Sequence, residues 1–181
     1  MSPQFLAFIP FVLDHEGRDF EDDPNDPGGA TKFGIDAKDH PGVDIANLTE
    51  DEAMAIYWQE WLDAKADKLP RVIGCVYFDE HVNAGPRPST VHLQAALNAR
   101  PGITDPAQVI AIDGVMGPLT QAAAWAAQGS PDIAHVIGDQ LDLRAARYRT
   151  LAQQPRFAGF LDGWLNRVAD LRTWAVSPPS L

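Results

Sequence analysis

Apolar and polar positions near the N-terminus recur with the period of an amphipathic α-helix. At the spacing i, i+3, i+4, i+7, four apolar side chains share one helical face: Phe5, Phe8, Ile9 and Val12. Pro10 interrupts this run, so we expect the helix either to kink there or to begin there. The apolar stretch is too short to span a bilayer, which favours a packed N-terminal helix over a membrane anchor.

Capping and stop signals predict a succession of further helices. Thr49 and Glu52 have the spacing of a capping box, which predicts a helix that follows them and ends by Leu69-Pro70. The apolar stretch 71–84 predicts the most buried helix, and Gly85-Pro86 is its stop signal.

The second half of the chain continues this helical pattern. Ser89 is placed to cap a helix over 90–99, and Pro118 has the position of a first-turn proline. A long helix is expected from Pro131 to about residue 152, and a last one over about 157–174. Short alternation over residues 31–36 instead predicts one strand of a small hairpin.

Composition and charge narrow the class of protein. The 181 residues are 45% hydrophobic and 22% charged, as in a globular protein that buries a real core. Cys75 is the sole cysteine, which excludes an intrachain disulfide and a cysteine-based zinc site. The net charge of −11 argues against a general nucleic-acid binder.

The charge is divided unevenly between two parts of the chain. Residues 1–82 carry a net charge of −12, and residues 83–181 carry +1, which suggests different roles for the two parts. Arg144 and Arg147 lie one helical turn apart in the later part. They are a candidate surface for anionic wall or membrane groups, with a solvated helix face as the plain alternative.

The candidate chemistry lies between residues 15 and 35. Glu16 closes the N-terminal hydrophobic helix, and Asp26 and Thr31 follow on a glycine-rich turn and strand. Cleavage of a glycosidic bond needs one carboxylic acid to protonate the leaving oxygen, and a second polar group to position a water on the opposite face. An acid on a helix and its partner on a hairpin would place a cleft between two lobes.

Metal sites are disfavoured by the same segment. Pro24 and Pro27 break the EF-hand pattern among the acidic residues, and Asp19 stands where a His-Glu-x-x-His zinc motif needs its second histidine. We therefore expect no metal and no organic cofactor.

Several motifs together resemble glycoside hydrolase family 108, lysozyme-like N-acetylmuramidases that include phage endolysins. In chain order they are Glu16-Gly17, Asp26-Pro27-Gly28-Gly29-x-Thr31-x-x-Gly34-Ile35, Phe78-Asp79-x-x-Val82-Asn83-x-Gly85, Leu93-Gln94, Asp113-Gly114-x-x-Gly117-Pro118-x-Thr120 and Gly163-Trp164-x-x-Arg167-Val168. The later motifs resemble the peptidoglycan-binding module that accompanies the family. The resemblance therefore covers nearly the whole chain.

The resemblance implies a mainly α, lysozyme-like bilobed fold with a small β-hairpin, extended by a helical peptidoglycan-binding region. Residues 1–88 are the expected catalytic region, and residues 89–181 the peptidoglycan-binding region, packed against it as one body. The implied reaction is hydrolysis of the β-1,4 bond between N-acetylmuramic acid and N-acetylglucosamine, with Glu16 as the catalytic acid.

The other site residues rest on residue type and order. Asp26, helped by Thr31, is the predicted organiser of the attacking water, which implies inversion at the anomeric carbon. The Glu16–Asp26 spacing is one residue longer than the family pattern, which makes Asp23 a rival. Three residues are predicted to contact substrate: Tyr57, Trp61 and Asn83. For the two aromatic residues core packing is the alternative, and for Asn83 a buried polar network with Asp79.

Three other functions stay open. A lytic transglycosylase would use the same acid without water, and an amidase or endopeptidase would need zinc or a cysteine. A non-catalytic wall-binding protein would not need Glu16. The expected partner is the glycan strand of peptidoglycan, with no nucleic acid and a monomeric protein. Without an export signal, we expect synthesis in the bacterial cytoplasm and release through a holin pore or a dedicated secretion system.

Overall fold

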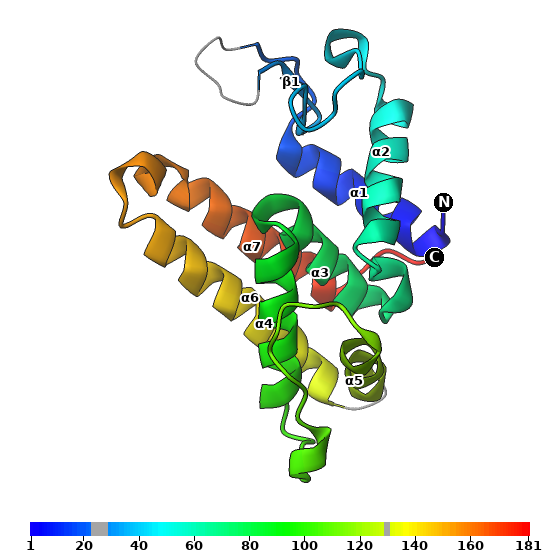
Figure 1. The fold of residues 1–181 in the computed structure, drawn as a ribbon, viewed down its shortest axis with the longest axis vertical. Helices are drawn as coiled ribbons and strands as arrows, with labels where there is room; N and C mark the ends of the chain where they lie inside the picture. Colours follow the sequence, from blue (N-terminus) through cyan, green and yellow to red (C-terminus); the bar gives the residue numbers. More distant parts are fainter. Residues whose placement is uncertain (23–28, 129–130) are drawn as a thin grey trace. The chain divides into compact units, whose positions relative to one another are not determined.

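The chain forms two compact units, whose helices and strands are drawn in Figure 1. The computed structural model describes residues 1–22, 29–128 and 131–181. The first unit comprises Met1–Asp63 with Leu181, and the second comprises Ala64–Ser180. Helices dominate both units, and a two-stranded antiparallel sheet lies in the first. The predicted mainly α fold with a small β-hairpin is confirmed.

Helix α1 (Pro3–Glu16) opens the first unit. The Ser2 side chain caps it by accepting a hydrogen bond from the backbone N–H of Phe5 at 3.2 Å. The predicted apolar face is buried, and Leu13 extends it. A start at Pro10 is wrong, because the helix begins seven residues earlier. Pro10 lies inside it on an exposed position.

The hairpin is shorter and more complete than the sequence predicts. Strands β1 (Thr31–Lys32) and β2 (Ile35–Asp36) pair antiparallel, so residues 31–36 form both strands rather than one. Phe33 and Gly34 join them with φ of 56° and 74°, the two positive values typical of a type I′ turn. Ile35 anchors the hairpin, since its side chain is 1% exposed.

Helix α2 (Glu50–Asp63) follows the 3-10 helix η1 (Ile45–Asn47). The predicted capping box is confirmed: the Glu52 carboxylate accepts from the Thr49 N–H at 2.9 Å, and the Thr49 hydroxyl accepts from the Glu52 N–H at 3.3 Å. The helix packs on α1, where the Phe5 and Trp61 rings meet edge-on at 5.8 Å.

Among the described residues of the second unit, the regular secondary structure is helical. Its α-helices are α3 (Arg71–Ala84), α4 (Pro86–Ala99), α5 (Pro118–Gln128), α6 (Asp132–Leu151) and α7 (Leu161–Val176). The 3-10 helix η2 (Ala66–Lys68) precedes them, and η3 (Pro106–Gln108) and η4 (Pro155–Phe160) lie between them. Contacts join α4 to α3 and to α6, and α6 to α7. Their shared interior is the core of this unit.

Several predicted boundaries are confirmed, and two are wrong. α3 has its predicted bounds and eight consecutive buried residues, from Ile73 to Glu80. α4 begins at Pro86 rather than after Ser89, whose hydroxyl donates to the backbone carbonyls of Gly85 and Pro86. Proline suits a first turn, so Gly85-Pro86 both ends α3 and starts α4. The last α-helix begins at Leu161, because the preceding residues form η4.

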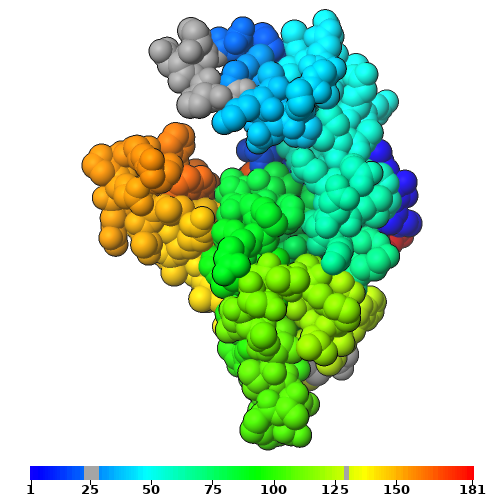
Figure 2. All heavy atoms as spheres, in the orientation of Figure 1, coloured from blue at the N-terminus to red at the C-terminus, as the bar shows by residue number. Residues whose placement is uncertain are grey.

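The loop between α4 and α5 lies at the surface. In the space-filling view it forms the green end of the second unit (Figure 2). Val109, Ile112 and Val115 within it are each at least half exposed. Polar contacts to α4, described below, hold the loop in place.

Candidate active site

Glu16 lies where α1 ends against the hairpin. It is the last residue of the helix, and Gly17 follows it with φ of 85°, a backbone angle that suits glycine. Its half-buried side chain lines a small pocket of about 110 Å³, together with residues of the segment 17–21 and of the hairpin. The sequence therefore places a carboxylate on a rigid helix end at the edge of a pocket.

The hairpin turn approaches Glu16 very closely. A Cβ atom at Gly34 would lie 2.8 Å from Glu16 Cβ, 2.8 Å from Glu16 Oε2 and 2.8 Å from the Tyr57 hydroxyl. That hydroxyl donates a hydrogen bond to the Phe33 carbonyl oxygen at 2.7 Å. The turn thus lies between the acid on α1 and the tyrosine on α2, and glycine is the residue that leaves room for both.

Thr31 is the second predicted site residue that the structure brings to this pocket. Its backbone pairs with that of Glu21, through hydrogen bonds of 2.8 and 2.9 Å, and its hydroxyl donates to the Gly29 carbonyl at 3.2 Å. Thr31 and Glu16 line the same pocket. Catalytic roles for both stay predictions.

The pocket is also lined by charged residues that were not predicted from the sequence as site residues. Asp19, Glu21 and Lys32 contribute to its wall beside Glu16. The dense run of acidic residues after Glu16 was the available signal. Asp26 and its rival Asp23 lie outside the described residues, so their assignment also stays a prediction.

Glu60 on α2 is another carboxylate of the first unit that the predictions did not use. Burial raises its pKa, His40 opposes this effect, and the negative charge of Glu16 raises it again. The imidazole Nε2 of His40 lies 3.6 Å from Glu60 Oε1. An acid near Glu16 with a raised pKa adds to the set of groups that govern protonation there.

The aromatic residues predicted to contact substrate are packing residues as they lie here. Tyr57 is 2% exposed and Trp61 is fully buried, so neither presents a ring face on which a sugar could stack. Tyr57 instead holds the hairpin turn through its hydroxyl, and Trp61 packs on Phe5. Substrate binding by these two residues stays a prediction.

The described residues contain neither a metal-binding cluster nor a membrane-spanning helix. In residues 1–22, 29–128 and 131–181, no group of three or more His, Cys, Asp or Glu side chains is arranged to hold a metal ion. Within these same ranges, no helix has the length and apolar character needed to cross a membrane.

Comparison with known proteins places these features in a family. Residues 9–85 match the family described as Glycosyl hydrolase 108, and residues 89–169 match the Predicted Peptidoglycan domain. The chain joins a glycosyl hydrolase 108 region to a peptidoglycan-domain region. It is therefore a cell-wall lytic enzyme, a glycoside hydrolase that acts on peptidoglycan.

Structural comparison supports this assignment over nearly the full length. The chain is similar to the structure of Brucella abortus SagA, with a TM-score of 0.73 and 28% sequence identity, over 96% of this chain and 94% of that chain. This similarity agrees with the predicted lysozyme-like fold class. No curated protein matches the chain significantly by sequence. The family boundary after residue 85 follows α3, whereas the two compact units divide between Asp63 and Ala64.

A buried charged network in the second unit explains two of the quoted motifs. Asp79 of the glycosyl hydrolase 108 region is fully buried and forms ion pairs with Arg144 at 2.6 Å and Arg167 at 2.8 Å. Burial raises the pKa of Asp79, but the two guanidinium groups outweigh that effect and lower it to about 2. The network joins α3 to α6 and α7.

Asn83 belongs to this network, as its alternative interpretation predicted. Its side-chain oxygen accepts a hydrogen bond from the Tyr148 hydroxyl, which in turn accepts from Arg144 Nε at 2.8 Å. Arg144 is fully buried and pairs with Asp79 inside the protein, so the predicted wall-facing role for it is wrong. A substrate contact by the half-buried Asn83 stays a prediction.

The Asp-Gly motif of the peptidoglycan-domain region is held by one buried glutamine. Gln94 Nε2 donates to Asp113 Oδ1 at 2.8 Å and to the Thr120 hydroxyl at 3.1 Å, while its Oε1 accepts from the Gly114 N–H at 2.9 Å. Hydrogen bonds from Gln94 and from the Val115 N–H lower the pKa of Asp113. These motif residues therefore fix the loop ahead of α5 to α4.

Proposed function

We propose that this protein is an N-acetylmuramidase, which hydrolyses the β-1,4 bond between N-acetylmuramic acid and N-acetylglucosamine within glycan strands. The observation that carries the proposal is the placement of Glu16. Glu16 ends a helix whose apolar face is buried, lines a pocket with Thr31 and lies against the hairpin turn at Gly34. A carboxylic acid so held can meet a glycosidic oxygen with little rearrangement.

In the proposed reaction Glu16 protonates the oxygen that leaves as the bond breaks. Asp26, helped by the Thr31 hydroxyl, orients and activates the water that attacks the anomeric carbon from the other face. The oxygen of this water bonds to the anomeric carbon, and one of its protons passes to the Asp26 carboxylate. Because the attack comes from the face opposite the leaving oxygen, the configuration inverts. Such a mechanism requires the two carboxyl groups to lie about 6.5–9.5 Å apart.

Product analysis tests the reaction and the acid together. Purified peptidoglycan is digested with the wild-type protein, with Glu16→Gln and with Glu50→Gln, and the fragments are read by mass spectrometry. Glu50 is an exposed residue of α2 whose surface ion pair with Arg18 contributes little to stability, so it serves as a matched control. We expect reducing N-acetylmuramic acid ends from the wild type and the control, and none from Glu16→Gln.

The same digest distinguishes the alternatives. Full activity in Glu16→Gln would contradict the acid assignment. Anhydro-muramic ends in place of reducing ends would show a lytic transglycosylase. Asp26→Asn and Asp23→Asn, compared in parallel, test which carboxylate assists, and the anomer formed first, followed by NMR, tests inversion.

We further propose that the protein acts as an endolysin, synthesised in the bacterial cytoplasm and released to the wall through a holin pore or a dedicated secretion system. Its substrate class lies beyond the cytoplasmic membrane, which the enzyme must therefore pass. Expression in a bacterial host with and without a holin tests this role: we expect lysis of the culture only with the holin. Light scattering during size-exclusion chromatography tests the expected monomer.

A further inference from the structure

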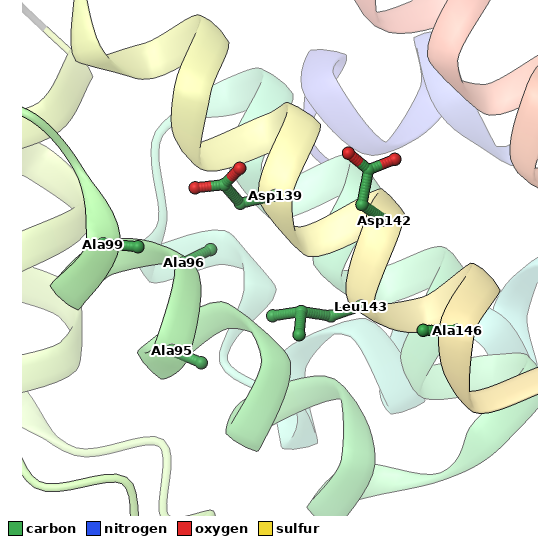
Figure 3. A pocket seen from close by; sticks show the side chains of 7 residues that line it. All are labelled: Ala95, Ala96, Ala99, Asp139, Asp142, Leu143 and Ala146. Atoms are coloured by element: carbon green, nitrogen blue, oxygen red, sulfur yellow. The ribbon is translucent and has the colours of Figure 1, made fainter.

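A separate pocket of about 370 Å³ lies between α4 and α6 of the second unit (Figure 3). Its walls consist mainly of methyl groups and one larger apolar side chain, with two carboxylates: Ala95, Ala96, Ala99, Leu143, Ala146, Asp139 and Asp142. The volume is within the range of small-ligand sites. All of these residues lie in the stretch that matches the Predicted Peptidoglycan domain.

The two carboxylates of this pocket differ in what they contact. Asp142 pairs with Arg172 of α7 at 2.6 Å. Figure 3 shows its carboxylate turned away from the alanines of α4. Asp139 extends on the side of α6 that faces Ala96. Its side chain is half-buried, and no hydrogen bond or ion pair reaches it from the described part of the chain. The pocket therefore holds one carboxylate available to a ligand.

These surroundings select the chemistry of the occupant. A sugar ring would lose hydrogen bonds to water against a methyl-lined wall and would find few polar groups to replace them. A short peptide with methyl side chains suits that wall, and a primary ammonium group complements the charge of Asp139. The stem peptide of peptidoglycan combines both features, since it contains alanines and a diamino acid with a free amine.

We infer that this pocket binds the stem peptide of peptidoglycan, with the ammonium group of its diamino acid at Asp139 and an alanine methyl group against Ala95 and Ala99. The inference rests on the proposed function in one respect, that peptidoglycan is the substrate. It adds a peptide contact, remote in the chain from Glu16, by which the enzyme would distinguish peptide-bearing glycan from bare glycan.

A synthetic stem peptide tests the site directly. The probe is N-acetyl-L-Ala-γ-D-Glu-meso-diaminopimelyl-D-Ala, which keeps one free amine, and its comparison is the same peptide with that amine acetylated. Binding to the full chain is measured by calorimetry. We expect acetylation to weaken binding about tenfold or more, since it removes one charge-assisted hydrogen bond. Asp139→Asn should weaken binding of the free-amine peptide to the same extent.

Two further variants control the result. Asp162→Asn removes one negative charge at an exposed position on α7 and should bind the peptide like wild type. Ala95→Leu fills the pocket and should abolish binding, with thermal unfolding measured to show that the variant is folded. Equal binding by wild type and Asp139→Asn, or no binding of the peptide at all, would overturn the inference. Cleavage of peptide-free glycan strands, measured on the same preparations, reports on Glu16 alone, so failure of the pocket and failure of the muramidase proposal give different results.

Discussion

Gly34 lies between the candidate acid and the tyrosine that fixes the hairpin, so one added methyl group there tests the whole site. In Gly34→Ala the new Cβ would lie 2.8 Å from Glu16 Cβ and from the Tyr57 hydroxyl, closer than real Cβ contacts. The flexible end of Glu16 can move aside, but its Cβ belongs to a rigid helix. The turn must therefore shift away from α1, or the helix end must shift away from the turn.

The expected loss of stability has two parts, backbone strain and overpacking. An L-residue at the φ of 74° of this position costs about 1–2 kcal/mol of stability. Overpacking against Glu16 and Tyr57 adds about 1–3 kcal/mol. For activity, displacement of a catalytic group by about 1 Å lowers the rate by about a hundredfold. Reaching ordinary contact needs about half of that displacement, so we expect a loss of at least about tenfold.

Gly42→Ala separates backbone strain from overpacking against Glu16 and Tyr57. Gly42 also has a positive φ, of 96°, but within the described part of the chain no atom lies within 4 Å of the position its Cβ would take. It should lose stability through backbone strain and keep its activity. Turbidity loss of a peptidoglycan suspension gives kcat/KM, and thermal unfolding gives stability. The reasoning is refuted if Gly34→Ala is folded at the assay temperature and cleaves peptidoglycan within twofold of Gly42→Ala.

Three predictions concern the second unit. Asp79→Asn leaves the buried guanidinium groups of Arg144 and Arg167 without a counter-charge and should cost about 3–5 kcal/mol in urea unfolding; a loss below 1 kcal/mol would contradict the buried network. Because the pKa of Asp79 is lowered to about 2 from an unfolded value near 4, its ion pairs stabilise the fold fully above pH 4. That contribution, about 2 kcal/mol, disappears as the pH falls toward 2, and the pH dependence of unfolding in this window should be smaller in Asp79→Asn. Gln94→Leu leaves Asp113 and the loop ahead of α5 without several hydrogen bonds and should raise hydrogen exchange at the Gly114 amide; unchanged protection there would show that Gln94 does not hold the loop.

Features set by short stretches of chain could be predicted from sequence. The buried face of α1 follows from apolar spacing, and the Thr49–Glu52 capping box from two side chains three residues apart. The bounds of α3 follow from an apolar run closed by glycine and proline. The sequence predicts one strand of the hairpin rather than two, because the reversal of the chain depends on a positive φ at Phe33, which phenylalanine rarely adopts.

Contacts between residues far apart in the chain could not be predicted from the sequence. Arg144 and Arg167 meet Asp79 from 65 and 88 residues away, and spacing along one helix gives no sign of either pair. The same holds for the close approach of Gly34 to Tyr57. The pocket beside Glu16 includes Glu21 because its backbone pairs with that of Thr31, a pairing that no local pattern specifies.

The position of the arginines changes how wall recognition should be understood. From Arg144 to the C-terminus the sequence has six arginines and two aspartates, which suggests a basic surface. Arg144 and Arg167 are buried against Asp79, however, and Arg172 pairs with Asp142 at the surface. Three of these six arginines are therefore paired with two aspartates within the unit, so long-range attraction to an anionic wall is weaker than the count implies. Recognition by shape and by a single carboxylate, as in the pocket at Asp139, depends little on that count. It should therefore persist at salt concentrations that screen surface charge.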